Sequence, residues 1–163
     1  MDKKTKEILE IFAAFFAAWL GYQFLAIVAG TPLPVVSVVS DSMYHQNGGF
    51  DEWWKTREEF YAGAGISKDA FAHFPFRNGL SRGDLLFVVN AAPEIGDVII
   101  YNRNSISIVH RLVSEGGDTY VTKGDNNLAA DQPVAKREIH GKVVLAVPLL
   151  GYPRYLLFEI FRI

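Results

Sequence analysis

The sequence contains no cysteine, and this absence excludes several kinds of chemistry. Without thiols the chain cannot form disulfides, cysteine-based zinc sites or iron–sulfur clusters, and it has no thiol nucleophile. It also lacks an excess of either charge, because 16 Lys and Arg residues stand against 18 Asp and Glu, giving a formal net charge of −2. Nucleic-acid binding needs a basic surface to hold phosphates, so the charge balance argues against it.

What the chain does contain is apolar and aromatic: 50% of its 163 residues are hydrophobic, with 12 Phe, 7 Tyr and 3 Trp. This composition excludes a disordered chain, and the length suits one folded domain. A run without charge, IFAAFFAAWLGYQFLAIVAG, occupies residues 11–30. As a helix with a rise of ~1.5 Å per residue it would cross the ~30 Å hydrocarbon layer. Residues 1–30 are therefore predicted to be a cytoplasmic N-terminus and a transmembrane anchor.

The orientation of this anchor follows from the charges around it. Lys3, Lys4 and Lys6 precede the run, and no charge follows until Asp41. Positive residues stay on the cytoplasmic side, so the rest of a single-pass chain is predicted outside the cytoplasm. The protein is therefore predicted at the cell membrane, or at the endoplasmic-reticulum membrane in a eukaryote. A buried core helix and a cleaved signal peptide are the alternatives, but the run exceeds the ~7–15 residues of a signal-peptide core.

Residues 31–150 are predicted to form a β-rich domain. Pro32 and Pro34 end the helix, because neither can continue it. Short β-branched runs then follow at residues 35–40, 84–89, 97–102, 108–114, 119–123 and 142–147. Gly116-Gly117, between two of these runs, indicates a hairpin. The predicted fold class is therefore mainly β, with an N-terminal transmembrane helix followed by a β domain.

Two segments do not follow this pattern of short strands separated by turns. Residues 44–81 carry many aromatic residues among charges, look helical at 51–62, and are predicted to be an inserted, partly helical segment. Their aromatic side chains either pack on the β core, which we favour, or form a flap at the membrane or substrate. Residues 151–163 form an apolar C-terminal tail that is too short to span a bilayer. The tail indicates a lost second membrane helix or an interfacial helix.

Three short motifs supply the parts of a hydrolytic relay. They are SDSM at residues 40–43, His110 within an apolar run, and GDNN at residues 124–127 with Asp131 beyond it. A serine hydroxyl becomes a nucleophile when imidazole takes its proton and a carboxylate orients the imidazole. His45 is the fallback base if His110 does not act. The histidines have no metal-ligand spacing, so neither a metal site nor a cofactor is expected.

In order and setting, these motifs resemble those of type I signal peptidases. The resemblance covers residues 11–150 and includes the two Gly-Asp turns that enter strands, at residues 83–84 and 96–97. It is closest to the archaeal and endoplasmic-reticulum branch, in which histidine replaces the lysine of bacterial enzymes. It implies a signal-peptidase-like β domain and a serine endopeptidase that removes N-terminal signal peptides from secreted and membrane preproteins. The implied partners are those signal peptides, the lipid bilayer, and accessory subunits or a translocon.

The resemblance also implies roles for individual residues. Ser42 would be the nucleophile and His110 the general base. Asp131 would orient His110 and Asp125 would support the site, although the two aspartates could exchange roles. The hydroxyl of Ser40 would assist the backbone N–H of Ser42 in an oxyanion hole, where one donor is worth ~2.7–4 kcal/mol.

Two functions of other classes stay open at this point. A non-catalytic, membrane-tethered β scaffold or assembly subunit would not need Ser42. A self-cleaving regulator that shares the β fold would use a serine–lysine pair and a DNA-binding N-terminus, which the apolar run argues against. Lys123 is the one lysine near the motifs, and the hairpin is expected to carry it away from His110.

Overall fold

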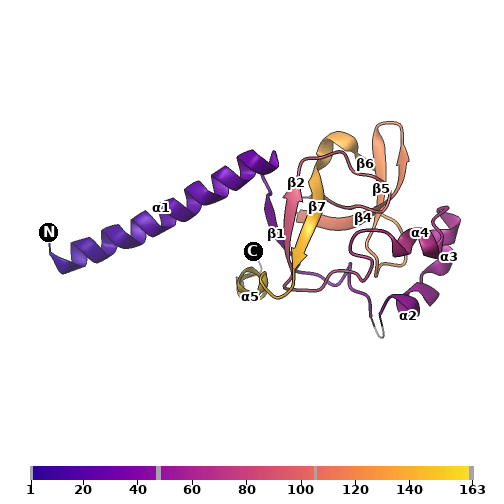
Figure 1. Cartoon of the computed structure of the whole chain (residues 1–163), viewed down its shortest axis with the longest axis horizontal. Coiled ribbons are helices and arrows are strands. Elements are labelled where there is room, and N and C mark those ends of the chain that lie inside the picture. The colour runs from indigo at the N-terminus through magenta and orange to yellow at the C-terminus, as the bar shows by residue number, and fades with distance from the viewer. Residues whose placement is uncertain (1, 47–48, 105, 162–163) are drawn as a thin grey trace.

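The computed structural model describes residues 2–46, 49–104 and 106–161. A long N-terminal helix projects from a β domain, and a group of short helices lies on the far side of that domain (Figure 1). The helices are α1 (Lys3–Ala29), α2 (Phe50–Lys55), α3 (Glu58–Gly63), α4 (Lys68–Ala72) and α5 (Tyr152–Phe161), with a 3₁₀ turn at Lys136–Glu138. The strands are β1 (Val35–Ser37), β2 (Leu85–Val89), β3 (Val98–Arg103), β4 (Ile106–Gly116), β5 (Thr119–Lys123), β6 (Val134–Ala135) and β7 (Ile139–Val147).

Helix α1 is long and apolar enough to cross a membrane, and none of its residues is buried by the rest of the chain. Asp2 caps its start by accepting a hydrogen bond from the Thr5 N–H at 2.7 Å. Gly30 ends it with φ +66°, in the left-handed region that favours glycine. The alternative of a buried core helix is therefore wrong, and α1 is a candidate membrane span.

The end of α1 is joined to the sheet by direct contacts. The Asn90 N–H, just after β2, donates to the carbonyl of Ala29 at 2.8 Å. The Tyr22 hydroxyl donates to the carbonyl of Pro32 at 3.0 Å. Leu25 of α1 and Phe87 of β2 line the same apolar pocket. The helix is thus held against the domain at its C-terminal end.

One antiparallel sheet contains all seven strands, in the order β1-β2-β7-β3-β4-β5-β6. The mainly β fold class is confirmed. The predicted hairpin is formed by β4 and β5, and Gly117 and Asp118 make its turn. The first strand is shorter than predicted, because Val38 leaves the ladder and exchanges hydrogen bonds with the turn at residues 83–84. Strand β6 was not predicted, since two residues carry no detectable alternation.

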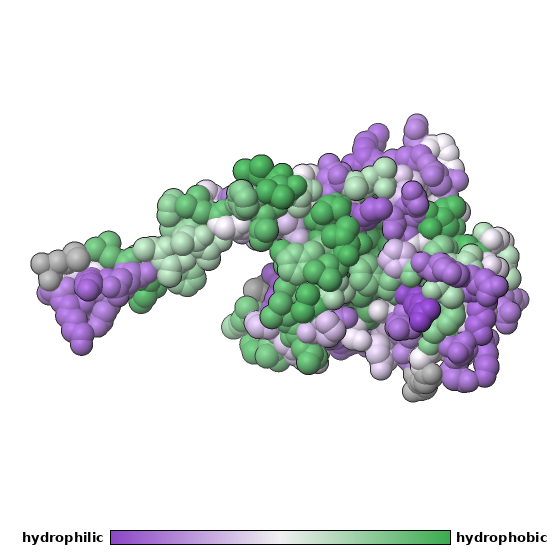
Figure 2. Space-filling view, viewed as in Figure 1, coloured by the Kyte–Doolittle hydropathy of each residue, from purple (hydrophilic) through white to green (hydrophobic). Residues whose placement is uncertain are grey.

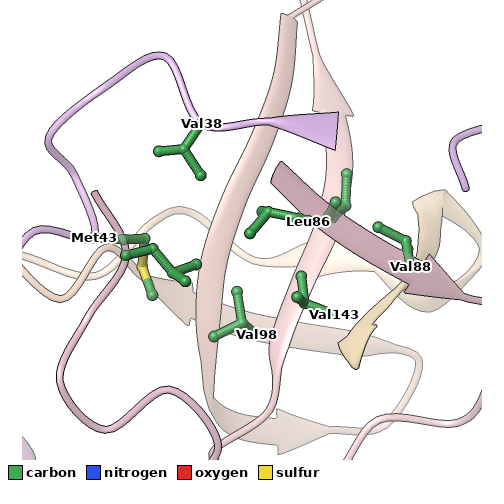
Figure 3. Close-up of a cluster of buried hydrophobic side chains, with 8 residues drawn as sticks. Val38, Met43, Leu86, Val88, Val98 and Val143 are labelled. Carbon is green, nitrogen blue, oxygen red and sulfur yellow. The ribbon is translucent and has the colours of Figure 1, made fainter. Parts of the chain in front are cut away.

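The core of the sheet extends directly to the serine motif. Its buried side chains are Val38, Met43, Leu80, Leu86, Val88, Val98, Ile100 and Val143 (Figure 3). Met43, which follows Ser42 in the chain, is only 1% exposed. Burial of this side chain stabilises the fold by about 2 kcal/mol and fixes the neighbouring serine at the edge of the core.

The inserted segment folds as α2, α3 and α4 rather than as one helix over residues 51–62. The Thr56 hydroxyl donates to the Trp53 carbonyl at 2.7 Å, which satisfies the acceptor that a continuing helix would use. Its buried aromatic side chains pack against Val113 of β4, so the packing interpretation is confirmed. They are Trp53, Trp54, Tyr61 and Phe71.

The C-terminal tail forms α5, which lies against the turn before β2. The Gly151 N–H donates to the carbonyl of Gly83 at 2.8 Å. Leu156, Leu157 and Ile160 of α5 are exposed. Figure 2 shows hydrophobic residues gathered over α5 and the strands beside it, on the side of the domain from which α1 projects. The apolar side of this helix thus faces outward.

Candidate active site

Three separate elements bring the serine and histidine motifs together. Ser42 lies in the turn after β1, His110 lies in β4, and Gly124 directly follows β5. A Cβ placed on Gly124 would lie 2.7 Å from the Ser42 carbonyl oxygen and 2.8 Å from His110 Nε2. Ser42 and His110 therefore flank Gly124, and only a residue without a side chain fits between them.

The ring of His110 is held by a carboxylate. His110 Nδ1 lies 2.6 Å from Asp131 Oδ2, and the hydroxyls of Thr122 and Tyr101 donate to the same oxygen at 2.7 and 3.1 Å. Burial alone would raise the pKa of Asp131, but these donors, above all His110, hold it below its usual value. An ionised Asp131 on Nδ1 leaves Nε2 of the neutral ring able to accept a proton.

The two serines of the SDSM motif contact each other. Ser42 Oγ lies 3.1 Å from Ser40 Oγ. Within the described part of the chain, the Ser42 N–H donates to no protein acceptor, and Ser42 Oγ has no hydrogen bond to His110. Catalytic hydrogen bonds often shorten only when substrate binds, so this geometry is compatible with a relay.

Asp125 is fully buried and makes its contacts elsewhere. Its carboxylate accepts hydrogen bonds from Arg111 Nε and Nη2 at 2.9 and 2.7 Å, and from the Tyr61 hydroxyl at 3.0 Å. His45 Nε2 lies 3.0 Å from the same carboxylate. Burial disfavours the charge, yet the Arg111 guanidinium and His45 hold the pKa of Asp125 well below its usual range. We call these four side chains the Asp125 cluster.

The Asp125 cluster joins the inserted segment to the sheet, away from His110. Consecutive strand residues face opposite sides, so Arg111 and its partner Asp125 lie on the other face of β4 from His110. The ring of His45 stacks on Trp53 with ring centroids 3.7 Å apart. His45, the alternative base suggested by the sequence, is therefore held by this packing and by Asp125. Of the two aspartates that the sequence left interchangeable, Asp131 is the one that contacts the His110 ring.

Sequence reasoning missed the two hydroxyls that hold Asp131. The signal was present in the alternation of strand residues: Tyr101 is two residues from Ile99, the register partner of His110. Thr122 pairs with Leu112, two residues beyond His110, so all three side chains belong to one face.

Comparison with curated proteins gives matches along most of the chain, although no protein-family model matches it. The chain is 32% identical to a "signal peptidase complex catalytic subunit SEC11" of Fusarium vanettenii, over 91% of this chain and 76% of that protein. The protein of the same name from Pyrenophora tritici-repentis is 30% identical, over 94% of this chain and 80% of that protein. The chain belongs to the signal peptidase I family. The sequence-based resemblance is thereby confirmed, since these relatives are SEC11 catalytic subunits of the endoplasmic-reticulum type.

A buried lysine of this signal peptidase lies close to the site but on its other side. Lys123 pairs in register with Arg111, and its Nζ donates to the carbonyls of Gly124 and Asp125 at 3.0 and 3.3 Å. Its ammonium also lies 5.0 Å from the ring centroid of Tyr61. Burial lowers the pKa of Lys123 to about 8. The lysine therefore lies on the face of the Asp125 cluster and not on that of His110.

This buried lysine makes the stability of the protein depend on pH. Lys123 titrates near 8 when folded and near 10.5 when unfolded, so the unfolded chain binds more protons between these values. The contribution of Lys123 to the free energy of unfolding should therefore rise by about 2 kcal/mol from pH 8 to pH 10. Lys123→Met should flatten that slope, and the exposed Lys55→Met should keep it. Denaturant unfolding of the full chain in micelles measures both, and an unchanged slope in Lys123→Met would contradict the prediction.

The lack of space for a side chain at Gly124 predicts that a substitution there reduces the cleavage rate, although it removes none of the proposed reacting groups. In Gly124→Ala the new methyl group would press on His110 Nε2 and on the Ser42 carbonyl. A displacement of about 1 Å at reacting groups can reduce the rate by about 100-fold, which is the loss we expect in kcat. Gly116→Ala is the matched control, because nothing lies within 4 Å of its added Cβ. Equal cleavage rates for the two variants would show that the close approach at Gly124 is unimportant.

Proposed function

We propose that this chain removes N-terminal signal peptides from secreted and membrane preproteins as a membrane-anchored serine endopeptidase. Ser42 is the nucleophile, His110 the general base and Asp131 the carboxylate that orients the base. The observation that carries the proposal is the 2.6 Å contact of Asp131 with His110 Nδ1, in a ring whose Nε2 approaches Gly124 beside Ser42. Membership of a family of catalytic signal peptidase subunits supplies the reaction.

In the proposed mechanism His110 Nε2 takes the proton of Ser42 as its oxygen attacks the scissile carbonyl. Ionised Asp131 stabilises the imidazolium that forms. The imidazolium then protonates the leaving amine of the mature chain, and the signal peptide stays bound as an ester of Ser42. Water, activated by the same imidazole, hydrolyses the ester and restores the free serine.

The developing oxyanion is assigned to the backbone N–H of Ser42 and the hydroxyl of Ser40. The N–H has no acceptor among the described residues, and the Ser40 hydroxyl lies 3.1 Å from Ser42 Oγ. Donors held in place before the reaction stabilise a transition state more than they stabilise a neutral carbonyl. This pair therefore suits acyl transfer to Ser42.

We assign Asp125 a positioning role rather than direct chemistry. The next residue, Asn126, donates its N–H to the Ser42 carbonyl at 2.8 Å and its side-chain amide to the Asp41 carbonyl at 3.1 Å. By fixing this loop through Arg111, Asp125 holds the serine turn in place. The supporting role expected of Asp125 would thus act through the backbone.

The membrane topology is part of the same proposal. With α1 in the bilayer and Lys3 and Lys6 on its cytoplasmic side, residues 31–161 would lie outside the cytoplasm. A signal peptide presents its scissile bond at the end of an apolar stretch, so both molecules meet at the same membrane surface. The SEC11 relatives are named as subunits of a complex, and we propose accessory subunits as partners here.

A covalent label tests the nucleophile without changing the chain. The purified chain in lipid bicelles should cut a preprotein once, at the end of its signal peptide. A signal-peptide analogue with a phosphonate ester at its C-terminus should leave an adduct on Ser42, mapped by mass spectrometry. Excess preprotein should block labelling. An adduct on another residue, or cleavage that continues after full labelling of Ser42, would overturn the assignment.

A further inference from the structure

A polar pocket of about 370 Å³ lies in the inserted segment beside the serine turn. Its lining residues are Gln46, Glu52, Trp53, Thr56, Arg57 and Asn126. Asn126 belongs to the loop that holds the nucleophile, since its N–H donates to the Ser42 carbonyl at 2.8 Å. One wall of the pocket is therefore in direct contact with the residue that carries out the proposed reaction.

Arg57 gives the pocket a positive charge that is not neutralised by an ion pair. Its Nη2 donates to the Asn126 carbonyl at 2.8 Å and its Nη1 to the Thr56 carbonyl at 3.1 Å, and both acceptors are neutral. Its buried Nε has no partner, and no carboxylate of the described residues lies within 4.0 Å of the guanidinium. The one acidic lining residue, Glu52, is paired with Lys55 at 2.6 Å. A guanidinium with only neutral acceptors favours a carboxylate ligand.

The position of the pocket indicates which part of a substrate reaches it. Helices α2–α4 lie on the side of the sheet away from α1 and α5 (Figure 1). A signal peptide approaches from the bilayer, on the side of α1, so the chain beyond the scissile bond leaves in the direction of the inserted segment. An extended chain advances ~3.3 Å per residue, so the pocket beside the serine turn is within reach of the first few residues after the cut.

We infer that this pocket binds the beginning of the mature chain, and that Arg57 favours preproteins with Asp or Glu among the first four residues after the cut. The inference rests on the proposed function and adds a substrate preference to it. It also gives the inserted segment a task, namely to supply a wall of the substrate site that the β core lacks.

The test compares preproteins that differ at one position. Asp, Asn or Lys is placed in turn at each of the first four positions after the cut, and kcat/KM is measured for the full chain in bicelles. At one position or more the Asp substrate should exceed the Lys substrate about tenfold. Arg57→Gln should bring the ratio near one, and Arg57→Glu should invert it. Arg77→Gln, which changes an exposed arginine of the same segment outside the pocket lining, should keep the wild-type ratio.

The ratio separates specificity from structure, because a disturbed Asn126 loop would slow the Asp and Lys substrates equally. A wild-type ratio near one at all four positions, or an unchanged ratio in Arg57→Gln, would overturn the inference. Binding of a fluorescent peptide from the start of an acidic mature chain to the Ser42→Ala variant tests the pocket without catalysis. Binding that depends on Arg57 there would support the pocket even if the assignment of Ser42 failed, and binding independent of Arg57 would refute it.

Discussion

Replacing Ser42 with alanine is expected to lower kcat for preprotein cleavage by about 10⁴-fold or more, with the fold retained. The proposed mechanism has no other nucleophile, so the variant keeps only the rate that binding and the oxyanion donors provide. The removed hydroxyl has Ser40 Oγ as its one hydrogen-bond partner among the described residues, so its loss should change the free energy of unfolding little. Single-turnover cleavage in bicelles and thermal unfolding measure the two effects.

Alanine variants of two further serines provide a comparison for the loss of kcat in Ser42→Ala. Ser40→Ala removes a proposed oxyanion donor and should lower kcat by about 10²-fold to 10³-fold. Ser107→Ala changes an exposed serine of β4, whose hydroxyl donates to Asn102, and should leave kcat unchanged. Cleavage by Ser42→Ala at the rate of Ser107→Ala would remove Ser42 from the mechanism. A Ser40→Ala variant with full activity would assign the oxyanion hole to backbone groups alone.

Changing each aspartate to asparagine is expected to have a different effect. Asp131→Asn should mainly reduce activity, and Asp125→Asn should mainly reduce stability. Asp131→Asn removes the charge that stabilises the imidazolium, and kcat should fall by about 10²-fold to 10⁴-fold in a folded protein. Asp125→Asn leaves the fully buried Arg111 without its counter-ion. Breaking a buried pair in this way typically costs about 3–5 kcal/mol, so this variant should lose most of the stability of the domain.

Unfolding curves and cleavage rates of both variants separate these outcomes. Because the folded chain holds the pKa of Asp125 below its usual value, the stability that it contributes is present above about pH 4 and is lost as pH falls toward the folded pKa. That loss should be smaller in Asp125→Asn. The double variant Asp125→Asn with Arg111→Met should be more stable than Asp125→Asn alone, because no unpaired charge stays buried in it. A stable Asp125→Asn variant with normal unfolding would contradict the structural role of the Asp125 cluster.

Much of the fold could be predicted because its signals are local. The charge-free run of α1, the glycine turn between β4 and β5 and the β-branched runs each depend on neighbouring residues only. The resemblance implied that Asp131 orients His110, but the sequence left the exchange of Asp125 and Asp131 open, because both lie in one loop six residues apart. What separates them is the face of β4 that each reaches, and that depends on the register of β4 with β5. At the break between α2 and α3, the Trp53 carbonyl accepts hydrogen bonds from both the N–H and the hydroxyl of Thr56, and a hydrophobic pattern does not indicate these contacts.

The pocket beside Arg57 was beyond sequence reasoning for a different reason. Arg57 stands in a charged stretch that looks like an ordinary solvated helix surface. Its importance comes from Asn126, which is 69 residues away in the chain and contacts it through a carbonyl. Sequence patterns contain no record of a contact between an arginine and a distant backbone oxygen.

The hydrogen bond from Asn90 to Ala29 and the contact of α1 with β2 have a consequence for where cuts fall. In the proposed membrane topology these contacts leave no loose tether between α1 and the sheet, so we expect Ser42 to stay at a nearly constant height above the lipid. We therefore expect the proposed enzyme to select preproteins by the length of the apolar stretch before the scissile bond. A scissile bond should be cut only when the apolar stretch before it ends at that height, and lengthening this stretch by one helical turn should raise the bond past Ser42.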